Sequence, residues 1–418
     1  MGRVMRHGHW LSTLGGLLVV VAGLAVPSAL AASRWQLVGS ASPSTSSNTW
    51  QLIDGGRYHG SGAGAAIDDQ TMSMAGTLST LRVKLDASPG TGKSYVFTVV
   101  KNDSSTSMAC TISDLNTTCT YTASTLSVAT NDTLQLLCTP SGTPNSATAT
   151  WSVAFDSTTT RYTGLTSKLQ SNFTTNYGFA GGNAFSILSD VECPVPTAGS
   201  IRDLYVNLNT APGGTETRSY WLTKNGASQS LTCTVSGAAT TCTDTTHTTT
   251  VAAGDRVAIT TSASAAPAVT VGSLGVVFVP DVEGEWILKT SPVPSTTSTT
   301  YGEVNDENEG ATVSESLVNQ MVQATTIKAM YVKLASTPGG SGYVITLRKN
   351  GVDTALTCTV GGAGTTCNVS ATVTAADNDY LTYSLAPSGS PTSAPAVGIG
   401  LLLYNPTRRR VMINEDAN

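Results

Sequence analysis

Six of the eight cysteines in the chain occur as three pairs with one spacing. Eight residues separate the members of every pair, and the pairs are Cys110/Cys119, Cys233/Cys242 and Cys358/Cys367. Two thiols at this spacing could ligate zinc, exchange electrons or form a disulfide. Structural zinc takes four closely spaced cysteine or histidine ligands, and a redox pair usually reads Cys-x-x-Cys. The sequence has neither pattern and therefore predicts three disulfides.

The segment "LTCTVSGAATTC" (residues 231–242) shows how such a disulfide would form. If Cys233 faces Cys242 across a hairpin, residues 236–239 remain as a four-residue loop, a common hairpin length. Directly opposed residues have Cα atoms about 4.5 Å apart, which lies within disulfide range. Closing so short a loop should stabilise the fold by about 2.5–3 kcal/mol on the chain-entropy model.

Cys138 and Cys193 stand outside this pattern, because neither has an equivalent cysteine elsewhere in the chain. The simplest pairing joins them, which would fix one part of the chain against another. The alternatives are that these cysteines form a disulfide with another chain, or that both remain free thiols.

The densest acidic stretch, "GEVNDENEG" (residues 302–310), carries hard oxygen ligands of the kind that calcium prefers. The candidate ligands are Glu303, Asp306, Glu307 and Glu309. The stretch lacks the full spacing of a calcium loop, so a solvated loop is the alternative. Calcium is the one cofactor that the sequence suggests.

Three aromatic residues follow Ser/Thr-rich stretches at comparable places, namely Trp50, Tyr177 and Tyr301. Exposed aromatic rings stack on sugars or anchor protein interfaces. These residues are therefore candidate ligand-binding positions, and the alternative is that they belong to a core.

The sequence indicates no catalytic residues. It contains no Gly-x-Ser-x-Gly, and His59 and His247 lie at unrelated places. Asp132, Asp255 and Asp379 recur at the start of an apolar run, where an aspartate side chain typically bonds the backbone of a turn. We expect a protein that is not an enzyme.

An internal repeat organises these residues. The Pro-Gly pairs at Pro89, Pro212 and Pro338 are separated by 123 and 126 residues, a period that suits a complete small domain. The sequence predicts a leader over residues 1–31, three repeats over 32–157, 158–281 and 282–405, and a basic tail over 406–418.

Each repeat alternates apolar and polar residues with a period of two, as in Leu81, Val83 and Leu85. This alternation is typical of antiparallel strands with one buried face. The Lys-Asn pairs beginning at Lys101, Lys224 and Lys349 indicate tight hairpins. We predict an all-β chain of three tandem antiparallel β-sandwiches with hairpin disulfides.

The order of these signals resembles the globular heads of the first complement component and the wider tumour-necrosis-factor-like superfamily. The resemblance rests on Lys349-Asn350-Gly351, on Gly254-Asp255-Arg256-Val257 and on "GIGLLLYNP" from Gly398, and it covers about 80 residues of each repeat. It implies a jelly roll that forms trimers and binds partners. Three copies in one chain would then form a single-chain pseudo-trimer, and three beads in a row are the alternative.

The N-terminus is typical of an export signal. Arg3 and Arg6 precede the apolar run "LGGLLVVVAGLAV", and Ala29 and Ala31 provide small residues before a cleavage point. An uncleaved membrane anchor is the alternative. Cleavage would deliver a secreted or cell-surface protein outside the membrane, where disulfides persist.

Composition supports the same location, because only 12% of the residues are charged. A net charge of -5 argues against nucleic acid as a partner. We therefore expect an exported, non-enzymatic structural or adhesive protein of an extracellular surface, appendage or assembly. Its expected partners are copies of itself or other surface proteins, with glycans as a further option. An array of carbohydrate-binding modules, and a hydrolase with a site between repeats, are the alternatives.

Overall fold

Alternation of apolar and polar residues produces the long strands of the protein. In β4 (Gly76–Leu85) the side chains of Leu81 and Val83 are buried, while Arg82 between them is half-buried. The strand β14 (Gly199–Leu208) has the same pattern of burial. One face of each strand therefore lies against an apolar core.

A computed structural model of the chain provides these features. Met1–Ala31 separates as a unit of its own from Ala32–Asn418, which is a second compact unit. The predicted leader and the predicted tail 406–418 both lie outside the described residues. The described part of the chain contains no helix long and apolar enough to cross a membrane. The described residues are 33–53, 70–72, 74–157, 163–170, 175–178, 187–264, 267–268, 271–281, 285–291, 293–304, 313–315, 320–322, 325–377 and 379–404.

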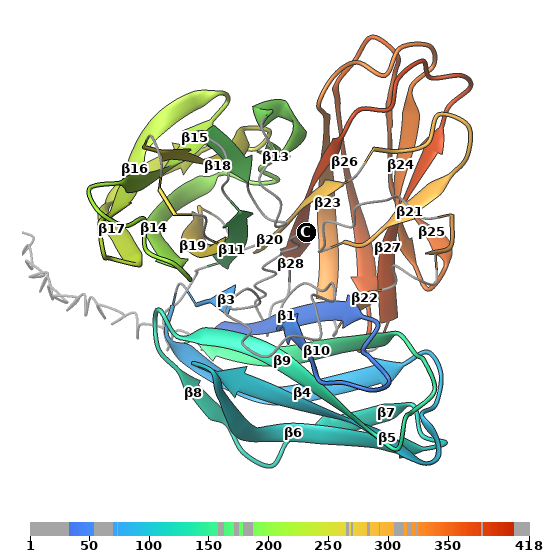
Figure 1. Cartoon of the computed structure of the whole chain (residues 1–418). Helices are drawn as coiled ribbons and strands as arrows, with labels where there is room; N and C mark the ends of the chain where they lie inside the picture. The colour runs from blue at the N-terminus through green and yellow to red at the C-terminus, as the bar shows by residue number, and fades with distance from the viewer. Residues whose placement is uncertain are drawn as a thin grey trace, which may run out of the picture. The chain divides into compact units, whose positions relative to one another are not determined.

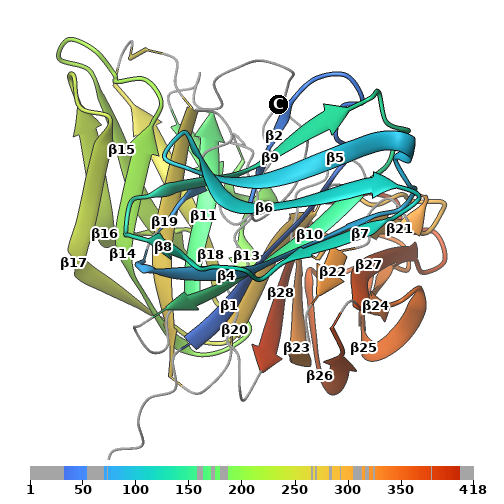
Figure 2. The ribbon, with the colours of Figure 1, turned by 90° about the horizontal axis from the view of Figure 1, so that it is seen from below.

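The strands of the first repeat are β1 Ser33–Ala41, β2 Thr49–Leu52, β3 Gln70–Thr71, β4 Gly76–Leu85, β5 Gly90–Lys101, β6 Ser104–Asp114, β7 Thr118–Tyr121, β8 Leu126–Val128, β9 Thr133–Ser141 and β10 Ala149–Ser157. They form two antiparallel sheets, which Figure 2 shows as separate layers. One sheet has the order β1-β10-β4-β7 with β8 paired to β4, and the other has the order β2-β9-β5-β6 with β3 paired to β9.

The elements of the second repeat are β11 Thr163–Gln170, β12 Thr175–Gly178, the 3-10 helix η1 Leu188–Asp190, β13 Cys193–Pro194, β14 Gly199–Leu208, β15 Thr217–Lys224, β16 Ala227–Ser236, β17 Thr241–Val251, β18 Arg256–Ala263 and β19 Val271–Pro280. The two sheets have the orders β11-β19-β14-β17 and β12-β18-β15-β16, with β13 paired to β18.

The strands of the third repeat are β20 Glu285–Ser291, β21 Thr300–Gly302, β22 Gln320–Val322, β23 Thr325–Leu334, β24 Tyr343–Lys349, β25 Val352–Val360, β26 Thr366–Ala375, β27 Asp379–Pro387 and β28 Val397–Tyr404. The sheet β20-β28-β23-β26 faces the sheet β21-β27-β24-β25, with β22 paired to β27. Figure 1 shows β23, β26 and β28 in one layer and β24, β25 and β27 in the other.

The three repeats share the strand order of a jelly roll. The first strand of each repeat pairs with the last one, as β1 pairs with β10, β11 with β19 and β20 with β28. The hairpins β5–β6, β15–β16 and β24–β25 each lie within one sheet, and the chain then crosses to the other sheet. The prediction of three antiparallel jelly-roll sandwiches is confirmed. The repeat boundaries after residues 157 and 281 remain predictions from the sequence.

The three predicted disulfides are present, and each joins the two sheets of its sandwich at one edge. Cys233 on β16 bonds to Cys242 on β17, with Cα atoms 5.7 Å apart. β16 pairs with β15, whereas β17 pairs with β14 in the opposite sheet. The two cysteines therefore do not face each other within one ladder, as the sequence suggested, because the short turn carries the chain between sheets. The same placement holds for Cys110–Cys119 and Cys358–Cys367.

The structure corrects the predicted bridge between Cys138 and Cys193, which are not bonded to each other. Cys138 on β9 lies in the core of the first sandwich, and Cys193 on β13 lies in the core of the second. Both side chains are 0% exposed, so each sulfur points into its own core and the two cannot meet. The register places Thr261 and Leu385 where the first repeat has Cys138, so the odd cysteine is a core substitution.

The second repeat replaces a core tyrosine by an arginine. Tyr95 and Tyr343 donate hydrogen bonds of 3.0 and 2.9 Å to a backbone carbonyl of the loop before the last strand. Arg218 occupies the equivalent register position and donates from Nη2 to the carbonyl of Ala268 at 2.6 Å. One buried donor thus ties this loop to the sheet in all three repeats.

Candidate functional site

The repeated Lys-Asn motif closes a turn. In the third repeat Asn350 Nδ2 donates to Asp379 Oδ1 at 2.7 Å, and the amide of Tyr380 donates to Asn350 Oδ1 at 2.8 Å. The amide of Ala376 donates to Asp379 Oδ2 at 2.8 Å, and Lys349 Nζ lies 3.6 Å from that oxygen. The prediction that the recurring aspartate is a turn residue is confirmed. The equivalent pairs are Asn102–Asp132 and Asn225–Asp255.

The three candidate aromatic residues occupy one register position. Trp50 pairs with Leu137, Tyr177 with Thr260 and Tyr301 with Ser384, each on the edge strand β2, β12 or β21. Trp50 and Tyr301 are half-buried, and the side chain of Tyr177 is outside the described part of the structure. The sequence therefore identified an equivalent position correctly, and its use for ligand binding stays a prediction.

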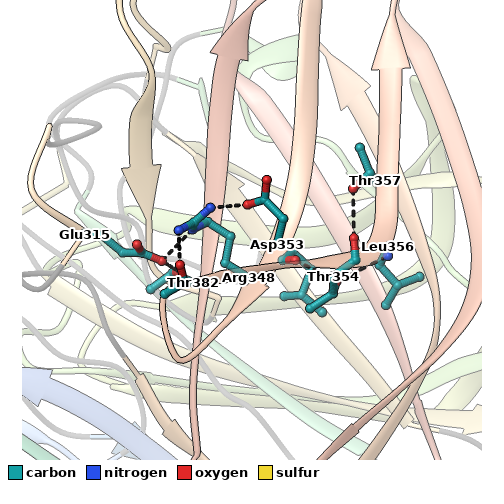
Figure 3. A network of polar contacts seen from close by, with 9 residues as sticks. Glu315, Arg348, Asp353, Thr354, Leu356, Thr357 and Thr382 are labelled. Carbon is teal, nitrogen blue, oxygen red and sulfur yellow. Dashed lines mark hydrogen bonds and ion pairs between the residues drawn. The ribbon is translucent and has the colours of Figure 1, made fainter.

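Arg348 covers the ring of Tyr301, with its guanidinium carbon 5.5 Å from the ring centroid. Arg348 Nε donates to Glu315 Oε1 at 2.7 Å, while its other nitrogens contact Asp353 and the carbonyl of Gly351. Figure 3 shows Glu315 and Asp353 on opposite sides of Arg348. One ring face of Tyr301 is thus occupied by a cation instead of being open to a sugar.

Glu315 completes this network from the segment 313–315. Thr382 Oγ1 donates to Glu315 Oε1 at 2.7 Å, so one carboxylate oxygen receives two donors. Burial tends to raise the pKa of Glu315, but the hydrogen bonds from Arg348 and Thr382 outweigh it and lower the pKa below its usual value. The network fastens the segment to β24 and β27 through residues that no sequence motif marks. The equivalents of Arg348 are Val100 and Thr223, so no repeated signal marked it.

The candidate calcium ligands are only partly within the described residues. Glu303 is buried, with 4% of its surface exposed, whereas Asp306, Glu307 and Glu309 lie outside the described ranges. Within those ranges, no group of three or more His, Cys, Asp or Glu side chains could hold a metal ion. The calcium site stays a prediction.

His247 forms a pair with Asp244 on β17. His247 Nδ1 lies 2.8 Å from Asp244 Oδ2, and the amides of Thr232 and Thr246 donate to the same carboxylate at 2.9 and 3.0 Å. Burial opposes ionisation, but these hydrogen bonds outweigh it and hold the pKa of Asp244 well below its usual range. Asp244 lies beside a β-bulge, where β17 and β14 shift register, and its carboxylate accepts from the amides of Thr246 and His247, which the bulge frees.

The short strands β3, β13 and β22 make contacts between repeats. β3 of the first repeat packs on β19 and β14 of the second, and β13 of the second packs on β28, β20 and β23 of the third. β22 of the third packs on β1 and β10 of the first. The same element of each repeat therefore contacts the same sheet of the next, and the third contact returns to the first repeat.

The outward face of β10 shows how these contacts are accommodated. Trp151 and Val153 point into the core of the first sandwich. The alternate residues Thr150, Ser152 and Ala154 are also buried, at 8%, 0% and 3% exposure, although they face away from that core. Small side chains on this face let the neighbouring repeat approach closely.

Each of the three contacts has its own chemistry. In the first-to-second contact, Val277 of β19 joins the core cluster of the first repeat. In the third-to-first contact, Arg82 Nη1 lies 3.8 Å from Asp377 Oδ2, and Lys84 Nζ lies 4.7 Å from the ring centroid of Tyr380.

The second-to-third contact contains buried charge. Arg256 Nε donates to Glu192 Oε2 at 2.9 Å, and the Glu192 side chain is only 6% exposed. Lys333 of β23 is also buried, and it interacts electrostatically with both residues. Burial, together with the neighbouring Arg256, lowers the pKa of Lys333, while Glu192 acts in the opposite direction.

No protein-family model matches the chain, and no curated protein sequence matches it. Among solved structures, one described as "The Triple Jelly Roll Fold and Turret Assembly in an Archaeal Virus" aligns over 84% of this chain and 83% of that chain, with 8% identity and a TM-score of 0.20. Dimeric latent PorU from Porphyromonas gingivalis aligns over 80% of this chain and 34% of that chain, with 12% identity and a TM-score of 0.21. PNGF-II aligns over 75% and 98%, with 7% identity and a TM-score of 0.19. Likenesses at these TM-scores carry no argument about function.

The described polar clusters therefore close turns, cap a bulge or fasten a segment. The surfaces that act on other parts of the protein are the three contacts between repeats, and these are the functional features that the geometry supports best.

Proposed function

We propose that the protein is an exported, non-catalytic structural subunit in which three jelly rolls close on one another as a single-chain pseudo-trimer. The observation that carries the proposal is the set of head-to-tail contacts made by β3, β13 and β22. A head-to-tail contact either continues indefinitely or closes into a ring. Here the third contact returns to the first repeat, as a ring requires.

A trimer built from one chain cannot dissociate by dilution, because its three parts share a backbone. The effective concentration of each repeat for the next is set by the linker between them and not by the amount of protein present. This property suits a building block of an extracellular surface, appendage or assembly.

Export is supported by the leader pattern of residues 1–31 and by the disulfides that close one edge of each sandwich. Disulfides persist in oxidising compartments and constrain the unfolded chain. A surface rich in Ser and Thr with few charges fits the same location.

Membership of the tumour-necrosis-factor-like superfamily is the finer form of this proposal, and its support is the jelly-roll strand order together with the Lys-Asn turns. The proposed partners are copies of the same chain or other surface proteins, with glycans as a further class. We propose no cofactor for this protein, and neither nucleic acid nor the membrane is a proposed partner.

The proposal is tested by purifying the mature protein from the culture fluid or cell surface of its source. Electron microscopy of the purified chain should show three-lobed particles, each with the volume of a single chain. Gold-labelled antibody should mark an extracellular structure on intact cells. An extended row of three separate beads, or a protein confined to the cell interior, would contradict the proposal.

A further inference from the structure

Two glycines of β28 lie against the backbone of the second repeat. A Cβ atom placed on Gly398 would sit 2.5 Å from the carbonyl oxygen of Glu192. A Cβ atom placed on Gly400 would sit 2.1 Å from the carbonyl oxygen of Pro194. Real Cβ atoms essentially never approach another atom within 3.0 Å, so both positions require glycine while β13 is docked.

The other two repeats do not offer this space. The register of the last strand with its neighbour aligns Gly398 with Thr150 and Ser273, and it aligns Gly400 with Ser152 and Gly275. Of the three last strands, β28 alone carries glycine at both positions. The segment around β13 could therefore not approach β10 or β19 as closely as it approaches β28.

Charge disfavours one of the two other sheets, that of the second repeat. Lys333 of β23 interacts electrostatically with Glu192 and Arg256 of the second repeat, and Glu192 is the one negative charge among these three residues. The position of Lys333 corresponds to Lys84 in the first repeat and to Asn207 in the second. On the second repeat's own sheet, the Glu192–Arg256 pair would meet a neutral asparagine.

We propose that β28 is a docking surface specific for the Glu192–Pro194 segment, with Gly398 and Gly400 as the residues that determine this specificity. The β13 segment of the second repeat then fits the sheet of β28 in the third repeat, and it does not fit the sheets of β10 or β19. The three repeats can therefore close in one order. This inference rests on the proposed pseudo-trimer and names the partner of one of its contacts.

The glycines act at the contact and not inside their own sandwich. Ile399 and Leu401 point into the core of the third repeat, so Gly398 and Gly400 face away from it. Alanine forms strands at least as well as glycine. A Gly→Ala change should therefore disturb the docked segment while it leaves the sandwich intact.

Hydrogen–deuterium exchange on the full-length mature protein tests this inference with Gly400→Ala and the milder Gly398→Ala. The matched control is Gly361→Ala, because a Cβ there meets nothing within 4 Å. In both test variants the amides of residues 191–196 and 397–404 should exchange about tenfold faster or more, as in a local opening, while peptides from β15 and β16 keep the wild-type rate.

A second variant covers the case in which Gly400→Ala does not fold. Glu192→Gln keeps the backbone and removes the negative charge beside Arg256 and Lys333, and it should accelerate exchange in the same two segments. The inference is overturned if Gly398→Ala and Glu192→Gln both exchange like Gly361→Ala. It is also overturned if the glycine variants accelerate exchange throughout the third sandwich while residues 191–196 keep their protection.

These results are independent of where the protein is located. Extracellular three-lobed particles together with unchanged exchange in the test variants would reject the docking specificity and keep the proposed function. Faster exchange in the two segments, for a protein found inside the cell, would keep the docking and reject the proposed function.

Discussion

Asn102 and Asp132 lie 30 residues apart in the chain, and their side chains share a hydrogen bond of 2.7 Å. The same bond joins Asn225 to Asp255 and Asn350 to Asp379. Each asparagine also accepts from the backbone amide of the residue after the aspartate. One side chain therefore fixes the position of a hairpin turn relative to a strand that begins much later, which explains why the two motifs recur together.

Replacing Asn350 tests this turn. Asn350→Ala should destabilise the protein by about 1–2 kcal/mol, because it leaves the donors and acceptors of the turn unsatisfied and places alanine at φ 52°. Asn350→Gly should cost less, since glycine adopts positive φ without strain. Denaturant unfolding measures both changes. Asn368→Ala, at an exposed position of β26, is the control, and a cost equal to that of Asn350→Ala would contradict the assigned role.

Acid should weaken the same turns. The pKa of Asp379 is lowered below 3.8 chiefly by its hydrogen bonds from Ala376 and Asn350. For Asp132 and Asp255, burial raises the pKa but the hydrogen bonds outweigh it, so these values are also lowered. A carboxyl group whose folded pKa is lowered contributes stability above its unfolded pKa, and that stability disappears as the pH falls through the folded pKa.

The free energy of unfolding should therefore stay level from about pH 6 to pH 5 and fall as the pH drops below about 4. Asp379→Asn removes one titrating group, so its pH profile should be flatter in the acid range than that of the wild type. Circular dichroism during denaturant unfolding at each pH gives both profiles. Identical slopes for the two proteins would mean that the pKa of Asp379 is the same in the folded and the unfolded state.

Removing a disulfide should cost more than removing a core thiol. The double variant Cys233→Ala with Cys242→Ala should lose about 2–3 kcal/mol, because the edge of the second sandwich is no longer closed. Denaturant unfolding measures this loss, with Cys138→Ala as the control in which no cross-link is removed. An equal loss in both variants would mean that packing, and not the cross-link, stabilises the edge.

The structure also predicts the thiol content of the mature protein. Burial raises the pKa of Cys138, so its thiol should react slowly with alkylating reagents in the folded state. After unfolding without reductant, mass spectrometry should find the label on Cys138. A mature protein that takes up label only after reduction would restore the predicted bridge between Cys138 and Cys193.

A double-mutant cycle should distinguish two ion pairs. Glu315→Gln with Arg348→Met should give a coupling energy of about 1 kcal/mol, because both side chains are more than four-fifths covered and Thr382 orders the carboxylate. Arg82→Met with Asp377→Asn should give less than about 0.5 kcal/mol, since that pair is 3.8 Å apart and about one-third exposed. The reverse order would contradict the network in Figure 3.

Local patterns in the sequence predicted much of the fold. Period-two alternation identified strands such as β4 and β14, because burial of one sheet face imposes that period directly. The spacing of Cys233 and Cys242 gave the correct disulfide. The same four-residue turn suits both a hairpin and a crossing between sheets, so the sequence could not show that the two cysteines belong to opposite sheets.

The longer-range features had no such pattern. Cys138 and Cys193 looked like a pair because both were unique, but uniqueness also arises when a core position accepts either cysteine or another small or apolar residue. Arg348 lies 33 residues from Glu315 and corresponds to Val100 and Thr223 in the other repeats, so it belongs to no repeated motif. Contacts such as Gly400 with Pro194 depend on how whole sheets meet.

A trimer of identical chains must display every surface three times. In this protein the related positions have diverged: Arg348 of the third repeat, with Glu315 and Asp353 around it, corresponds to Val100 in the first repeat and to Thr223 in the second. In the proposed pseudo-trimer, one polypeptide would therefore present three different outer faces in a fixed order. No rotation would relate these three sides, so a neighbour could recognise which of them it meets, whereas the three sides of a symmetric trimer are equivalent.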